Sequence, residues 1–174
     1  MKETLETINQ MQADGVIGKY AIGGAVGATF YIEPAATVDL DVFVMLPAAA
    51  SHTLISLSPI YEYLKAKGGR EESEYIVLGD WPVQFLVPSD ALEIEAIAQA
   101  VPIEVDGART WVMSPEHLAA IALRTDRPKD HIRIIQFISQ GALDRDKLNT
   151  LLLRYGLIEK WKHFESRFLE GTRG

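Results

Sequence analysis

Residues 20–46 read YAIGGAVGATFYIEPAATVDLDVFVML. They predict a strand, a glycine turn, a short helix and a second strand, in that order. The first strand is a short apolar run that stops at Gly23 and Gly24. The helix is expected over residues 25–32, and Pro34 ends it because proline has no backbone N–H to donate.

The second strand carries two acidic residues. Apolar and polar residues alternate over 38–46, so Asp39 and Asp41, two positions apart, point to the same side of the strand. Two carboxylates this close raise each other's pKa unless a cation lies between them. A hard divalent cation with oxygen ligands is the usual partner, and where phosphates are also present it is most often Mg2+, with Mn2+ as the alternative.

The glycine pair lies directly before the short helix. Without side chains, the backbone of Gly23 and Gly24 can approach a phosphate closely, and the helix N-terminus offers free N–H groups and a positive dipole to it. A phosphate-binding turn followed by a metal-binding acidic pair favours phosphoryl or nucleotidyl transfer.

Gly23-Gly24, a short helix and Asp39-x-Asp41 on a strand resemble the signature of the nucleotidyltransferase superfamily, which includes DNA polymerase beta-like and tRNA CCA-adding enzymes. The resemblance implies an α+β (α/β) fold, with a mixed β-sheet flanked by helices. It implies that Asp39 and Asp41 are catalytic and hold Mg2+ or Mn2+, and that the glycines, with Gly27, bind the nucleotide. The expected reaction transfers a nucleoside monophosphate from a nucleoside triphosphate to a hydroxyl group.

Residues 113–134, MSPEHLAAIALRTDRPKDHIRI, resemble a segment of the abortive-infection-type toxin nucleotidyltransferases. This likeness implies a helix followed by a basic-Asp element, a toxin role and a cognate antitoxin as partner. In an otherwise acidic protein, the five basic or histidine side chains within ten residues here are the best candidates for phosphate contacts: Arg124, Arg127, Lys129, His131 and Arg133. The expected nucleotide-binding set is Arg124, Arg127, Lys129 and Asp130, and the alternative is a charged helix junction with internal salt bridges. Asp130 is expected to face Arg127 or a backbone N–H. The toxin-like relatives carry a lysine where Ala122 stands, and Arg124 is the candidate substitute.

The resemblance also implies a third carboxylate on a later strand, and the matching position here is Gln84. Glutamine offers a carbonyl oxygen but cannot act as a general base. Glu74 and Asp90 are the other candidates for a third acid. The alternative is a catalytically degenerate protein of the same fold that binds nucleotide, RNA or a partner protein without turnover.

The rest of the chain predicts further strands and helices around this centre. Asp106-Gly107 is the strongest short hairpin signal. Strands are expected over 73–78, 81–87, 103–105 and 109–112, and helices over 1–11, 51–67 with a break or late start at Pro59, 88–100, 114–123 and, as two helices, 144–168. Residues 1–112 are interpreted as the nucleotidyltransferase-like core and residues 113–174 as a C-terminal helical segment packed on it as one structural unit.

Composition limits the function classes. The 174 residues contain no cysteine, which excludes disulfides and thiolate metal sites. The formal net charge of −7 argues against broad, nonspecific nucleic-acid binding. Since no leader and no apolar run near 18 residues is visible, we expect a cytoplasmic protein without a membrane span.

Two other interpretations of the opening stretch are weaker. A dinucleotide-binding oxidoreductase would need glycine where Ile22 stands, if Gly24 and Gly27 are the second and third glycines of its fingerprint. Solvated aspartates on an edge strand are also conceivable, but aspartate among valines is disfavoured without a reason. The acceptor stays open among a tRNA or other RNA end, a protein and a small molecule, and so do the choice of nucleotide and the oligomeric state.

Overall fold

A computed structural model describes residues 1–33, 39–47 and 56–169. In chain order, its helices and strands are α1 (Lys2–Ala13), β1 (Tyr20–Ile22), α2 (Gly24–Ala28), β2 (Leu40–Val44), α3 (Ser58–Ala66), β3 (Arg70–Glu72), β4 (Tyr75–Leu78), β5 (Trp81–Leu86), α4 (Ala91–Ala98), β6 (Val101–Val105), β7 (Ala108–Val112), α5 (Pro115–Thr125), α6 (Pro128–Ser139), α7 (Arg145–Arg154) and α8 (Ile158–Phe168).

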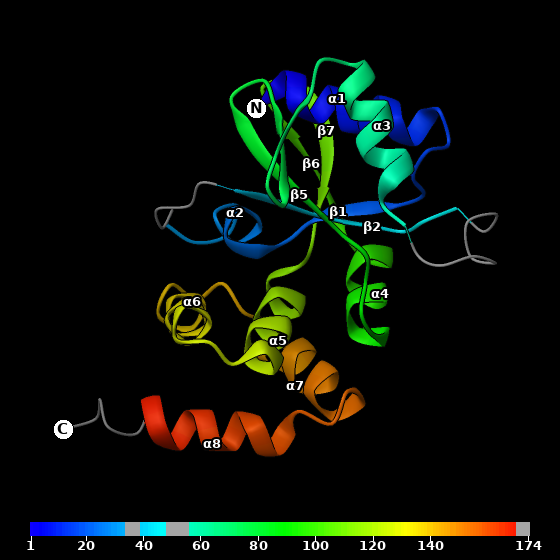
Figure 1. The fold of residues 1–174 in the computed structure, drawn as a ribbon. Coiled ribbons are helices and arrows are strands. Elements are labelled where there is room, and N and C mark those ends of the chain that lie inside the picture. The colour runs from blue at the N-terminus through cyan, green and yellow to red at the C-terminus, as the bar shows by residue number, and fades with distance from the viewer. Residues whose placement is uncertain (34–38, 48–55, 170–174) are drawn as a thin grey trace.

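The strands of the described residues form one mixed sheet in the order β3-β4-β5-β2-β1-β7-β6. β2 lies at its centre, antiparallel to β1 and parallel to β5. β1 is parallel to β7, and the outer pairs are antiparallel hairpins. Helices flank this sheet, so the predicted mixed sheet flanked by helices is confirmed (Figure 1).

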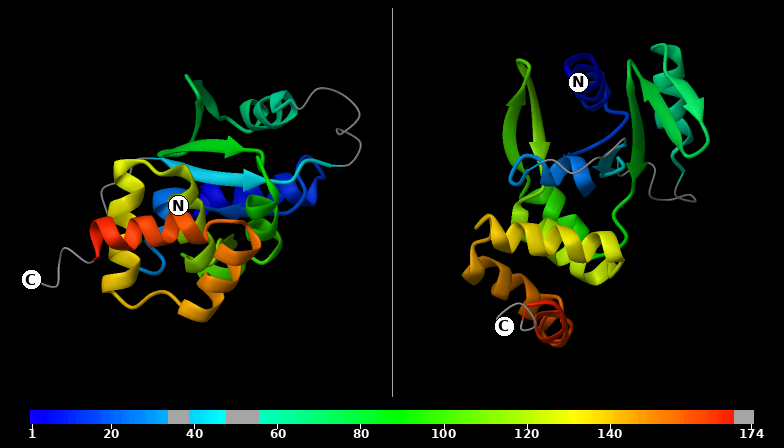
Figure 2. Two further views of the ribbon diagram at one scale, coloured as in Figure 1. Left: turned by 90° about the horizontal axis from the view of Figure 1, so that it is seen from below. Right: turned by 90° about the vertical axis from the view of Figure 1, so that its left-hand side faces the viewer.

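The sheet separates two hydrophobic clusters. On one face, α1 and α3 cover Leu40, Val42 and Val44, which are fully buried. The alternate residues of β2 point to the opposite face, where Phe43 joins a cluster built mainly from α4 to α8. The two views of Figure 2 agree with Figure 1 that α5, α6, α7 and α8 lie together on the side away from α1 and α3. The period of β2 therefore places Asp41 on the face towards α5 and α6.

Several predicted elements differ at their ends. The helix expected over 25–32 ends at Ala28, because the following turns are closed by i→i+3 bonds such as Tyr31 N–H to the Ala28 carbonyl at 2.9 Å. The helix expected from 51 begins at Ser58 with Pro59 in its first turn, which confirms the late start; residues 51–55 of that prediction lie outside the described part. The strand expected over 38–46 is confirmed at 40–44, and residue 38 is likewise not described.

Two elements were not predicted. Strand β3 consists of three charged, exposed residues and exists through its pairing with β4. Helix α6 covers most of the basic segment that the sequence marked for phosphate binding. The predicted division at residue 112 stays a prediction, and α4, which precedes it, packs against α5, which follows it. Within the described residues, no helix is long and apolar enough to cross a membrane.

Candidate active site

The acidic pair lies on the central strand of the sheet. Asp41 is in β2, where its carbonyl accepts a 2.9 Å hydrogen bond from the N–H of Gly23, and Asp39 precedes the strand. In the parallel pairing of β2 with β5, Asp41 stands opposite Gln84. The sequence assigned Gln84 to the place of a third carboxylate, and the register sets it beside Asp41 as expected.

The two glycines leave room for the side chains of β2. Gly24 has φ +58°, and a Cβ added there would lie 1.8 Å from Oδ2 of Asp41. A Cβ at Gly23 would lie 2.7 Å from the ring of Phe43. These glycines therefore let the β1–α2 turn pass directly over the carboxylate of Asp41. Gly27 is also closely packed, since a Cβ there would lie 3.1 Å from the carbonyl oxygen of Ile22.

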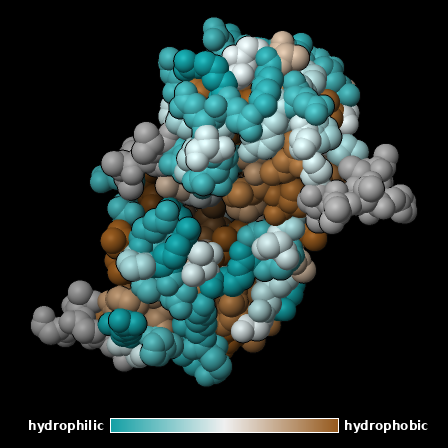
Figure 3. Space-filling view, in the orientation of Figure 1, coloured by the Kyte–Doolittle hydropathy of each residue, from teal (hydrophilic) through white to brown (hydrophobic). Residues whose placement is uncertain are grey.

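A cavity of about 240 Å³ opens in front of Asp41. Its polar lining is Gly24, Asp41, Gln84, Glu93, Thr125, Arg127, Asp130 and Arg133, and its apolar lining is Phe43, Leu86, Met113, Leu118, Ile121 and Ala122. In Figure 3, the surface between the upper and lower halves of the molecule is hollowed and carries hydrophobic side chains (brown) between hydrophilic ones. The cavity thus joins an apolar wall to a set of charged groups.

Helix α6 supplies the cations, and one buried carboxylate holds them. Asp130 is 1% exposed; its Oδ2 accepts from Nε of Arg127 at 2.7 Å, and its Oδ1 accepts from Nη1 of Arg133 at 3.4 Å. The predicted contact of Asp130 with Arg127 is confirmed, including a backbone bond from Arg127 N–H at 3.3 Å. Arg127 is the N-cap of α6, and Pro128 lies in its first turn. The start of the helix and the ion pair with Asp130 therefore both hold Arg127 in place.

The charges of this cavity act on Asp41. Burial raises the pKa of Asp41, and the neighbouring charge of Asp39 raises it further. Arg133, Lys129 and Arg127, in that order of strength, oppose this rise in the pKa. The pKa of Asp41 is therefore raised by burial and by Asp39 in spite of these three cations.

Arg124 has a different place from the other basic residues. Its guanidinium donates to the carboxylates of Asp90 and Glu93, which ties α5 to α4, and it is not part of the cavity lining. The expected nucleotide contact of Arg124 stays a prediction that this geometry does not favour. Asp90 is engaged as well, because it is the N-cap of α4 and accepts from the Glu93 N–H at 3.0 Å.

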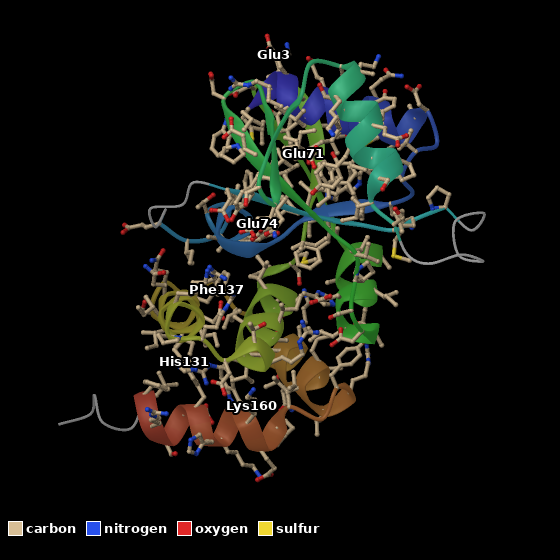
Figure 4. All side chains as sticks on the ribbon, in the orientation of Figure 1. Glu3, Glu71, Glu74, His131, Phe137 and Lys160 are labelled. Carbon is tan, nitrogen blue, oxygen red and sulfur yellow. The ribbon has the colours of Figure 1, made fainter. Side chains whose placement is uncertain are left out.

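A second hollow of about 440 Å³ lies beside Asp39. Its lining consists of Asp39, Glu72, Ser73, Tyr75 and Pro82. Glu74, the other candidate for a third acid, belongs to the turn between β3 and β4, and Figure 4 shows it at the end of that hairpin towards the helical half. It is not part of the lining of either hollow beside the acidic pair.

The residues present fit one divalent cation together with phosphates. Among the described residues, no group of three or more His, Asp or Glu side chains is placed to hold a metal. Mg2+ keeps several waters and is commonly bound by one or two carboxylates plus substrate phosphates, so the Asp39–Asp41 pair meets its needs without a third acid. Burial and the charge of Asp39 both raise the pKa of Asp41, and a bound cation would oppose that rise.

Three residues outside the expected nucleotide-binding set also line this cavity. Arg133, which the sequence places in the basic cluster, lies one helical turn after Asp130 and forms an ion pair with it. Glu93 lines the cavity from α4 and is buried, with a bond of 2.6 Å from the Ser89 N–H. Phe43 could have been found, because it shares the strand face of Asp41.

A scan against protein-family models finds no match, and a search of curated proteins finds none either. Among solved structures, the chain is similar to an antigenic nucleotidyltransferase-like protein from Paracoccidioides brasiliensis, with a TM-score of 0.55 and 15% identity over 95% of this chain and 90% of that one. The solution structure of the antibiotic-resistance factor ANT(2'')-Ia gives a TM-score of 0.48 at 19% identity, covering 94% of this chain and 99% of the other. The crystal structure of ANT(2'')-Ia in complex with adenylyl-2''-tobramycin gives 0.49 at 18%, covering 95% and 97%. At 15% identity, the likeness to the Paracoccidioides brasiliensis protein concerns the fold alone, and it confirms the expected nucleotidyltransferase-like fold.

Proposed function

We propose that this chain, which has the nucleotidyltransferase-like fold, is a metal-dependent nucleotidyltransferase. It would transfer a nucleoside monophosphate from a nucleoside triphosphate to a hydroxyl acceptor and release pyrophosphate. The observation that carries the proposal is the placement of Asp41 directly under Gly24, in a cavity that also holds Arg127 and Arg133. The cavity thus combines Asp41, a carboxylate for a metal, with cations for phosphates, and Asp39, two residues before Asp41, lines the neighbouring hollow.

Each group has a role in this scheme. Asp39 and Asp41 would hold Mg2+ or Mn2+, which when bound polarises the α-phosphate and neutralises charge on the phosphate oxygens. Arg127, Lys129 and Arg133 would balance the negative charge of the triphosphate. The backbone of Gly23, Gly24 and Gly27 is the proposed nucleotide-binding turn, a role that still rests on the sequence.

Gln84 sets a limit on the rate. Its amide oxygen, next to Asp41, can accept a hydrogen bond from the acceptor hydroxyl and so orient it, but an amide cannot take the proton. We therefore expect slow turnover, and Gln84→Asp should raise the rate at unchanged nucleotide affinity. The acceptor class remains an RNA end such as tRNA, a protein or a small molecule; a toxin role with a cognate antitoxin is proposed only from the sequence likeness of residues 113–134.

The second candidate function is nucleotide, RNA or partner-protein binding without turnover. It is favoured by the cavity lining itself, where Gln84 and Ala122 stand at positions that the sequence resemblance assigns to an acid and a lysine. Arg124 does not restore the lysine, since it is paired with Asp90 and Glu93.

Calorimetric titration of Mg2+ with each nucleoside triphosphate tests the proposal, comparing the wild type with Asp39→Asn/Asp41→Asn. The matched control is Glu3→Gln/Glu6→Gln, which removes two carboxylates from exposed positions of α1, with Glu3 at the far end of the molecule in Figure 4. We expect metal-dependent binding in the wild type and the control, and none in the aspartate variant. Equal binding in all three would move the nucleotide away from the acidic pair. If the wild type binds the nucleotide but releases no pyrophosphate when RNA, protein or small-molecule acceptors are added, the second candidate function is favoured.

A further inference from the structure

Arg133 is a cation of the cavity whose N–H groups are mostly without a hydrogen-bond acceptor among the described residues. Its side chain is 15% exposed and lines the same cavity as Asp41 and Gln84. A guanidinium has five N–H donors. In the described part of the chain, Arg133 donates one hydrogen bond, to Oδ1 of Asp130 at 3.4 Å. Most of its hydrogen-bonding capacity is therefore available to something inside the cavity.

In the absence of a ligand, the charges of Arg127 and Lys129 are already compensated by an ion pair or by solvent. Arg127 binds both oxygens of Asp130, at 2.7 Å and 3.2 Å, and its side chain is 54% exposed. Lys129 is exposed to solvent. Water screens such charges, whereas a half-buried guanidinium interacts more strongly with its neighbours. Among these three residues, Arg133 lowers the pKa of Asp41 the most, and burial lowers the pKa of Arg133 itself.

We propose that Arg133 is the resident counter-ion of Asp41 and is handed over to the triphosphate when the metal–nucleotide complex binds. This inference rests on the proposed function, and it adds an order of binding to it. A bare divalent cation that reaches Asp41 is repelled by the guanidinium. A cation that arrives with a triphosphate brings the negative charge that Arg133 needs, so the two ligands bind in a coupled way.

Coupling of this kind is reciprocal: if the nucleotide strengthens metal binding, the metal strengthens nucleotide binding by the same factor. The consequence is selectivity. The site discriminates against free divalent cations and against nucleotides that lack a metal. Arg133 thus acts as a specificity-determining residue, and removing it should change the affinities for metal and for metal–nucleotide in opposite directions.

Titration with Mn2+, followed by electron paramagnetic resonance of the free ion, measures both affinities. The probes are Mn2+ alone and Mn2+ with α,β-methylene-ATP, which cannot transfer its nucleotidyl group. The variants are Arg133→Gln, Arg133→Lys and the control Arg145→Gln, which removes one exposed positive charge at the start of α7, outside the cavity. Circular dichroism confirms that each variant is folded.

For Arg133→Gln we expect Mn2+ alone to bind about tenfold more tightly and the Mn2+–nucleotide complex about tenfold more weakly, each equivalent to about 1.4 kcal/mol. Arg133→Lys keeps the charge and should bind Mn2+ alone as the wild type does. Arg145→Gln should change neither affinity. A loss of packing would weaken both, so the opposite signs identify the counter-ion role.

Two results would overturn the inference in different ways. If the wild type binds the Mn2+–nucleotide complex and the Asp39→Asn/Asp41→Asn variant described above does not, but Arg133→Gln shifts both affinities in one direction or neither, the handover is wrong while the proposed function stands. If the wild type binds no Mn2+–nucleotide complex, the handover and the proposed function fail together. In case Arg133→Gln does not fold, Arg133→Lys still decides: tighter binding of Mn2+ alone in that variant contradicts a role carried by the charge.

Discussion

Gly24 is the position where a single added methyl group should damage both stability and the site. Its φ of +58° is left-handed, and the added Cβ would lie 1.8 Å from Oδ2 of Asp41. For Gly24→Ala, the left-handed backbone costs about 1–2 kcal/mol and the collision costs about 1–3 kcal/mol more. We expect the free energy of unfolding to fall by about 2–5 kcal/mol, as the sum of these two estimates.

Gly15→Ala is the matched control for this substitution. Gly15 has φ +75°, and no atom lies within 4 Å of a Cβ placed there, so this variant carries the backbone cost alone. Urea unfolding followed by circular dichroism gives both free energies. The difference between the two variants measures the collision with Asp41. Combining Gly24→Ala with Asp41→Ala in a double-mutant cycle should recover that difference.

Nucleotide binding gives the second measurement on the same variants. A displaced Asp41 carboxylate can no longer serve the metal, so Gly24→Ala should lose calorimetric binding of Mg2+–nucleotide while Gly15→Ala keeps it. The reasoning is refuted if both alanine variants are destabilised equally, the double mutant recovers nothing and Gly24→Ala still binds.

Three further predictions concern other charged groups. Asp41→Asn should raise the free energy of unfolding at pH 7, because burial raises the pKa of Asp41 and its ionisation therefore opposes folding above the unfolded pKa. Urea unfolding at pH 7 and pH 3 should show the gain at pH 7 only, and an equal gain at both would contradict this. Burial lowers the pKa of His117 from its unfolded value of 6.5, so the free energy of unfolding decreases as the pH falls below 6.5. His117→Gln should make the free energy of unfolding depend less on pH between pH 7 and pH 5, and an unchanged slope would contradict this. Arg124→Ala leaves the buried Glu93 and the capping residue Asp90 without their cation and should lower stability by about 1–3 kcal/mol in thermal unfolding, whereas an effect below measurement error would mean that the ion pairs are replaced by water.

The centre of the fold was predictable from two local signals, namely the two-residue alternation around Asp39 and Asp41 and the glycine pair before the short helix. Alternation alone placed Asp39 and Asp41 on one face, away from the buried valines of β2, and the parallel register with β5 then set Gln84 beside Asp41. The collision of a Cβ at Gly24 with Asp41 explains why glycine is needed there, and this reason is tertiary. No local pattern could have shown it, since the two residues meet only through the turn after β1.

Other features could not be deduced because they depend on how elements pack. The direction of Arg124 follows from the rotation of α5 against α4, and its partners lie more than thirty residues earlier in the chain. β3 has no apolar residue to reveal it and becomes a strand by pairing with β4. Helix α6 did carry a signal, namely Pro128 in the first turn with Asp130 as the acidic residue, which the emphasis on its charges obscured.

The strand order of the sheet has a consequence for synthesis of the chain. β1 and β2 leave the ribosome first, yet each is completed by a parallel neighbour made much later: β5 beside β2, and β7 beside β1, where Ile22 pairs with Val112. Until then, two apolar strand edges stay open to association with other nascent chains. Contacts of such long sequence separation slow folding. We therefore expect truncated chains that end before β7 to depend on chaperones, although they already contain both aspartates and the glycine turn.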